Sequence, residues 1–244
     1  MQGRGDTFIK RCHLFIRLKI YHMSIAEKYL ASFCEGGIYH VYNRTNNKEL
    51  LFRSGDNYHF FLRKYFQYLS PFVSTFCYNL LPNHFHLVIR IKSIREITAY
   101  LDNIEKEQLI TAEILFLTDP EKHLDKLIES AFHRFFTSYS MAFNKMFDRK
   151  GNLFHRPFKR IEIKEVSHLF KLIIYVHANE VKHGLTKNFE TDRGNHSYLS
   201  ILSVKPTALL RQEILNLFGG ADKFITTHRG MVKYYYDAEF AVED

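Results

Sequence analysis

The sequence predicts an α+β fold in which helices pack on a four-stranded, ferredoxin-like antiparallel sheet. Residues 36–44, 72–80 and 84–91 read as strands, and the first of them alternates side chains in period two. Stretches with a 3.6-residue apolar period stand between and after them. The resulting order of strand, helix, strand, strand, helix, strand, helix is ferredoxin-like, with the first and third strands central.

The first half of the chain gives a helix, a hairpin and an acidic insertion. Asp56 is expected to cap a helix over residues 57–69, and a tight turn over residues 81–83 joins the second and third strands. Residues 95–130 contain nine Asp or Glu against four Lys or Arg. We therefore expect a helical insertion over about residues 95–130 that lies away from any phosphate-binding face.

The second half begins with a long amphipathic helix. Asp119 and Pro120 form its N-cap and first turn, and its apolar period continues towards Gly151. An edge strand is expected over residues 158–163. A helical C-terminal extension over residues 201–244 follows the core domain of residues 34–200, with helices over 207–217 and up to Tyr236; residues 1–33 read as a basic N-terminal extension.

A helix over residues 167–183, capped by Ser167, carries the most informative pattern. Its apolar stripe is expected to face the sheet, and His177 on that stripe reads as a packed histidine. Tyr175 and Asn179, four residues apart, share the opposite side. The stripe comprises Phe170, Ile173, Ile174, His177 and Val181.

Charge and composition limit the partners and the compartment. The net charge of +8 and the pI of about 9.2 favour a polyanion such as nucleic acid or an anionic membrane, although a solvated basic surface also fits. Three cysteines without CxxC spacing indicate neither a disulfide framework nor a thiolate zinc site, so a reducing compartment such as the cytoplasm fits. No apolar run approaches the roughly 20 residues that cross a bilayer.

A His-x-His pair opens the third strand. Strand alternation places His84 and His86 on one face and Phe85 in the core. The pair alone fits a metal site and an ordinary surface or core pair equally well. With Asn179 as a third, oxygen ligand, it would hold Mg²⁺ or, more tightly, Mn²⁺, and Zn²⁺ is also compatible.

Tyr175 is the candidate nucleophile. A phenol has a pKa near 10, and the cations Lys171 and Lys182 nearby on the same helix favour its ionised form. Residues 145–164 are basic and interleaved with aromatic rings, which fits a nucleic-acid contact and a solvated loop equally. The candidate DNA-binding residues are Arg44, Arg149, Lys150, Arg156, Lys159, Arg160, Lys171 and Lys182.

Two segments carry a family resemblance. LPNHFHLVI resembles the His-hydrophobic-His motif of the HUH endonucleases, and IYVHANEVKHGL is similar to the tyrosine motif of the single-tyrosine HUH transposases of the insertion sequence 200 type, especially the REP-associated tyrosine transposases. IYHVYNRTNNKELLF, GNLFHRPFKRIEI and HSYLS resemble further parts of that family. The resemblance spans about residues 36–200.

The resemblance implies an HUH fold and a prokaryotic, nucleoid-associated enzyme. His84, His86 and Asn179 match the metal ligands and Tyr175 the nucleophile, in enzymes that cut single-stranded DNA at hairpin-marked sites and form a 5′-phosphotyrosine and a free 3′-OH. Glu180 stands where relatives often have proline. A monomer and a homodimer, with the tyrosine supplied in cis or in trans, both remain open.

Two other functions fit the same residues. One is a hairpin DNA or RNA binding protein that does not cut. The other is a metal-dependent nuclease that uses water and would keep its activity without Tyr175.

Overall fold

The computed structural model of the chain describes residues 29–190 and 195–237, with side chains up to residue 231. Most of the N-terminal extension expected over residues 1–33 therefore lies outside the described residues. Among the helices that are described, none is both long enough and apolar enough to span a bilayer.

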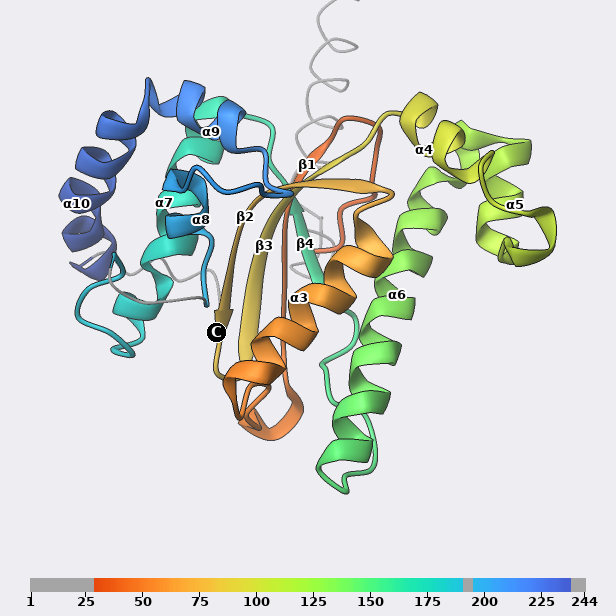
Figure 1. Cartoon of the computed structure of the whole chain (residues 1–244), viewed down its shortest axis with the longest axis horizontal. Coiled ribbons are helices and arrows are strands. Elements are labelled where there is room, and N and C mark those ends of the chain that lie inside the picture. The colour runs from red at the N-terminus through yellow and green to blue at the C-terminus, as the bar shows by residue number, and fades with distance from the viewer. Residues whose placement is uncertain (1–28, 191–194, 238–244) are drawn as a thin grey trace, which may run out of the picture.

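A four-stranded antiparallel sheet runs through the middle of the molecule (Figure 1). Its order is β2-β3-β1-β4, so the first and third strands are central and the ferredoxin-like prediction is confirmed. The strands are β1 (Ile38–Arg44), β2 (Val73–Leu81), β3 (His84–Ile91) and β4 (Lys159–Glu162). The fourth strand is at an edge of the sheet, where an edge strand over residues 158–163 was expected.

Helices α3 (Gly55–Leu69) and α6 (Pro120–Met146) cover one face of the sheet (Figure 1). The apolar side of β3 meets them, since the rings of Phe85 and Phe61 lie 5.2 Å apart and both are fully buried. Asp119 caps α6, because its carboxylate accepts a hydrogen bond from the Lys122 amide.

Most of the acidic residues 95–130 are in helices. They form α4 (Ile94–Leu101), a short 3-10 turn, α5 (Thr111–Thr118) and the first turns of α6. Helix α5 packs against α6 at the end of the molecule away from α7 (Val166–Lys182), the helix that carries Tyr175 (Figure 1).

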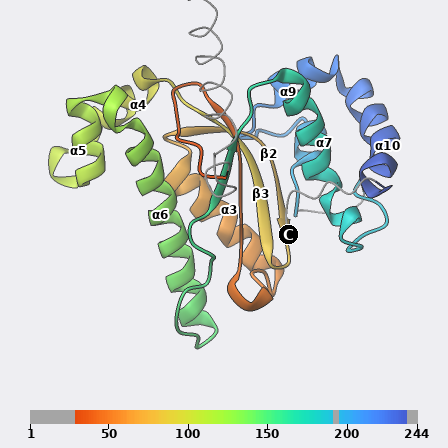
Figure 2. The same cartoon turned by 180° about the vertical axis from the view of Figure 1, so that it is seen from behind.

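Helix α7 (Val166–Lys182) covers the other face of the sheet, and the C-terminal helices lie outside it (Figure 2). They are α8 (Tyr198–Leu202), α9 (Arg211–Phe218) and α10 (Ala221–Asp237). The sheet is thus sandwiched between α3 and α6 on one side and α7 on the other. Helix α7 is itself sandwiched between the sheet and α10.

The predicted orientation of α7 is wrong. Its apolar stripe faces the C-terminal helices: the Phe170 ring stacks 4.4 Å from that of Phe218, and His177 Nδ1 lies 3.0 Å from His228 Nε2. The side that carries Tyr175 faces the sheet. The helix is buried on both sides, so its hydrophobic period alone could not show which side the sheet would cover.

Several helix ends also differ from the prediction. The N-cap of α7 is Glu165 and not Ser167, and the N-cap of α3 is Ser54 and not Asp56. Helix α9 begins at Arg211, later than expected, because α8 and the loop after it use the preceding residues. Such ends depend on tertiary packing as much as on local capping residues.

Candidate active site

His84 and His86 lie at the start of β3, on the face that α7 covers. The chain reaches them through the tight turn after β2, and strand alternation directs Phe85 to the opposite face. The two imidazole rings are 5.3 Å apart and nearly perpendicular. His86 is fully buried and His84 is half-buried.

Neighbouring side chains orient both rings. His84 Nδ1 lies 2.7 Å from Asn83 Oδ1, an acceptor, so Nδ1 carries the hydrogen and Nε2 the lone pair. His86 Nδ1 lies 3.0 Å from His40 Nε2. If His86 is the donor of this hydrogen bond, its Nδ1 carries the hydrogen and its Nε2 the lone pair, as in His84. Orientation of a histidine through its other ring nitrogen is typical of metal ligands.

Both histidines are neutral at neutral pH. Burial, together with the neighbouring Lys182 and His183, lowers the pKa of His84 and of His86 to about 3. A neutral imidazole presents a lone pair, which is the form that binds a metal. The pair therefore meets the first requirement for a metal site.

Tyr175 faces this pair from α7 of the same chain. Its ring lies 6.2 Å from the His86 ring, edge to face, and its side chain is buried. Lys182 Nζ lies 5.2 Å from the centre of the phenol ring. A cation at that distance stabilises the phenolate relative to the phenol.

Asn179 lies one turn after Tyr175 and is fully buried. Neither its Oδ1 nor its Nδ2 has a hydrogen-bond partner among the described residues. Leaving a buried amide without partners costs about 1–3 kcal/mol per group. An oxygen donor kept at this cost on the side of α7 that faces the sheet fits a metal ligand.

The expected metal site would need a third donor of another type, which is the part that Asn179 is expected to play. Within residues 29–190 and 195–237, no three His, Cys, Asp or Glu side chains are arranged to share an ion. Glu180 Oε2 lies 4.0 Å from Nε2 of the buried His196, which bridges to the edge strand β2. The donor set expected from the sequence is therefore two imidazoles and an amide oxygen.

Three further side chains, which the sequence analysis did not single out, lie around the histidine pair. The His183 ring lies 5.0 Å from that of His84, and the Tyr42 ring lies 5.9 Å from that of His86. His40 orients His86, as described above. The spacing of these residues in the sequence could have indicated them. His183 follows Asn179 by four residues on the same side of the helix, and His40 and Tyr42 share one face of β1.

Four of the candidate DNA-binding residues are solvent-exposed. Arg44 ends β1 directly opposite His84 in the register, and Lys171 projects from α7. Lys150 and Arg156 are exposed on the segment between α6 and β4. These four cations are accessible to a phosphate backbone.

The other four are at least partly buried. Lys182 lies over Tyr175, and Lys159 Nζ lies 4.8 Å from the centre of the Tyr29 ring. Arg149 forms an ion pair with Glu49 and donates to the Gly151 and Asn152 carbonyls, which shapes the loop after α6. Arg160 pairs with Glu129 and donates to the Ala31 carbonyl.

Comparisons with known proteins give one structural likeness. No family model and no curated protein matches the sequence. The fold is similar to that of a solved structure described as a REP-associated tyrosine transposase bound to a REP hairpin, with a TM-score of 0.49 and 13% sequence identity. The similarity covers 73% of this chain and 87% of that one.

Proposed function

We propose that the chain is a metal-dependent, single-tyrosine transposase that cleaves and rejoins single-stranded DNA. One observation carries the proposal. Tyr175 and the unpartnered amide of Asn179 lie on the side of α7 that faces His84 and His86, within one chain. A purely structural helix has no use for a buried amide without hydrogen bonds.

The three donors fit Mg²⁺ or Mn²⁺. His84 and His86 would each bind through Nε2 and Asn179 through Oδ1, which leaves positions for a phosphate oxygen and water. Bound there, the ion would act as a Lewis acid on a non-bridging oxygen of the scissile phosphate. The neighbours Asn83 and His40 hold the two rings in the required orientation.

The phenol oxygen of Tyr175 attacks the phosphorus once its proton has been lost to solvent. The bond from phosphorus to the 3′ oxygen breaks and that oxygen takes up a proton from water, so a 5′-phosphotyrosine and a free 3′-OH result. Lys182 stabilises the phenolate. The covalent bond conserves the energy that a later strand-joining step needs.

Single-stranded DNA bearing a hairpin is the proposed substrate. The sequence motifs point to it, and the exposed cations Arg44 and Lys171 flank the histidine pair and the tyrosine helix. Because both halves of the site belong to one chain, Tyr175 acts in cis whether the protein is a monomer or a homodimer.

Incubation with Mn²⁺ and hairpin-bearing single strands tests the proposal. We expect a covalent protein–DNA band on a denaturing gel that Tyr175→Phe abolishes. Tyr100→Phe is the matched control, since Tyr100 is exposed on α4. Failure of the wild type to form an adduct across a broad panel of hairpins and repeats would refute the proposal.

The same experiment separates the two alternative functions. A water-using nuclease would still release cut DNA in the Tyr175→Phe variant, without an adduct. A non-catalytic binder of hairpin DNA or RNA would retain its ligand equally with and without a chelator, and would cut nothing.

A further inference from the structure

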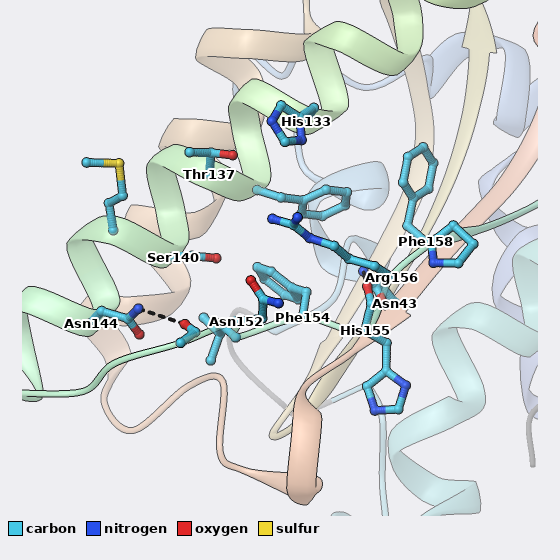
Figure 3. A pocket seen from close by; sticks show the side chains of 15 residues that line it. Asn43, His133, Thr137, Ser140, Asn144, Asn152, Phe154, His155, Arg156 and Phe158 are labelled. Carbon is cyan, nitrogen blue, oxygen red and sulfur yellow. Dashed lines mark hydrogen bonds between the residues drawn. The ribbon is translucent and has the colours of Figure 1, made fainter.

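A recess of about 580 Å³ lies between α6 and residues 151–158 (Figure 3). Since α6 and α7 cover opposite faces of the sheet (Figure 1), the recess and Tyr175 are on opposite faces. Its volume is within the roughly 300–1,000 Å³ typical of small-ligand sites. No step of the proposed reaction uses it.

One wall of the recess is polar and belongs to α6. His133, Thr137, Ser140 and Asn144 recur at helical spacing and line it together. Asn144 closes one end, because its amide donates to the Gly151 carbonyl. The hydroxyls of Thr137 and Ser140 can each donate and accept a hydrogen bond.

The floor of the recess is aromatic. The rings of Phe136 and Phe154 lie 5.0 Å apart, and Phe158 adds a third ring 5.5 Å from Phe136. Aromatic rings beside hydroxyl groups suit a planar heterocycle with polar edges, which is the chemistry of a nucleobase.

The charge of the recess favours an anion. The exposed Arg156 lines it and points towards the α6 wall in Figure 3, and no Asp or Glu is among its lining residues. Lys150 adds an exposed positive charge on the same segment. A cationic ligand would find no counter-charge here, whereas a phosphate would.

The recess and the histidine pair lie at the same end of the sheet. Asn43 lines the recess and its neighbour Arg44 pairs with His84, so successive residues of β1 point to the two sites. The segment that closes the recess is fixed to this strand end, because Asn43 Nδ2 donates to the His155 carbonyl. A strand held in the recess therefore needs only to round the end of β1 to reach His84.

We propose that the recess binds one unpaired nucleotide of the single-stranded DNA. The base packs on Phe136 and Phe154 with its edge on Thr137 or Ser140, and Arg156 binds the phosphate. This assignment rests on the proposed function for its ligand and adds a base-reading contact remote from the chemistry.

Binding without cleavage tests the assignment. The probe is a fluorescein-labelled DNA hairpin with single-stranded arms, measured by anisotropy with EDTA in the Tyr175→Phe background. Ser140→Phe fills the recess and Arg156→Ala removes its cation, and each should weaken binding about tenfold, the loss of one stacked base or charged contact. Lys106→Ala removes one exposed charge outside the recess and should leave affinity unchanged.

A scan of abasic positions along both arms adds a readout that does not depend on how a variant folds. One position should weaken binding to the unfilled recess about tenfold and have no effect on the Ser140→Phe variant. Equal affinity of all variants, or an abasic scan without a sensitive position, would overturn the assignment. If the recess assignment fails in this way but the wild-type protein still forms a covalent adduct, the proposed function stands. If binding depends on the recess but no adduct forms, the recess assignment stands and the proposed function fails.

Discussion

Two buried histidines should make the fold acid-sensitive. His228 of α10 faces the Phe224 carbonyl with Nδ1 at 2.8 Å, so this nitrogen donates and Nε2 accepts. His177 Nδ1 then donates to His228, and His177 Nε2 accepts from the Ser197 hydroxyl at 2.9 Å. The Ser197 oxygen accepts from the Tyr78 amide. The whole chain of hydrogen bonds is satisfied only when both rings are neutral.

The pKa of His228 sets the size of the effect. Burial lowers this pKa from 6.5 to about 4, and burial lowers the pKa of His177 well below its ordinary value. A depressed pKa means that the unfolded chain takes up protons first, so the stabilisation is complete above pH 6.5 and is lost as the pH falls towards 4. For His228 alone the linkage relation gives a loss of about 2 kcal/mol at about pH 5.

Urea unfolding followed by circular dichroism measures this loss. The His228→Gln variant keeps an acceptor near the position of Nε2 but does not titrate. Between about pH 7.5 and pH 5, the free energy of unfolding should fall by about 2 kcal/mol more in the wild type than in the variant. All other titratable groups are common to the two proteins, so their contribution cancels.

The reasoning would be refuted by equal losses of stability in the two proteins over this pH range. That result would mean that His228 binds its proton at the same pH in the folded and unfolded chains. It would also mean that the neutral hydrogen-bond chain does not hold α10 against α7.

Three further substitutions separate function from stability. Asn179→Leu removes a buried amide without partners, so the free energy of unfolding of the metal-free protein should rise by about 1 kcal/mol. The same variant should lose the rise in melting temperature that Mn²⁺ gives the wild type, whereas Asn179→Asp should keep that rise. Ser93→Ala should cost about 1 kcal/mol in urea unfolding, because the Ser93 and Glu96 side chains cap α4 reciprocally. Tyr65→Phe should cost a similar amount by losing the 2.8 Å hydrogen bond to Thr75 inside the core.

Local periodicity was sufficient to predict the sheet. Alternation along β1 and β3 fixes which side chains share a face, so His84 and His86 were predicted to lie together opposite Phe85, as they do. The short turn between β2 and β3 allows these strands to pair only as a hairpin, and the order of the elements is compatible with few sheet topologies. Pro120 after Asp119 likewise marks the start of α6 without tertiary information.

The orientation of α7 could not be predicted from its sequence. Ten of its residues are buried, on both sides of the helix, so the apolar stripe does not distinguish the sheet from α10. What decides the orientation is the partner surface. The sheet offers His86 and Asn79, and the Asn79 amide donates to the Val176 carbonyl, whereas α9 and α10 offer Phe218 and other apolar groups.

Neither the recess beside α6 nor the roles of individual arginines could be predicted from the sequence. The basic segment 145–164 reads as one surface, yet Arg149 and Arg160 are used to hold loops and Arg156 projects into the recess. Only the folded chain distinguishes cations with a local acceptor from cations that face solvent.

Burial of α7 on both sides has a consequence for the chemistry. Its outer side is held by neutral histidines and aromatic rings of α10, and its inner side carries Tyr175 and Asn179 towards the sheet. Close packing on both sides restricts movement of the helix, which keeps the phenol and the amide at fixed positions relative to His86. Because two different sets of contacts do this, protonation of His177 or His228 should loosen the tyrosine helix from its outer side. The C-terminal helices therefore support the geometry of the proposed site although they contribute no group to it.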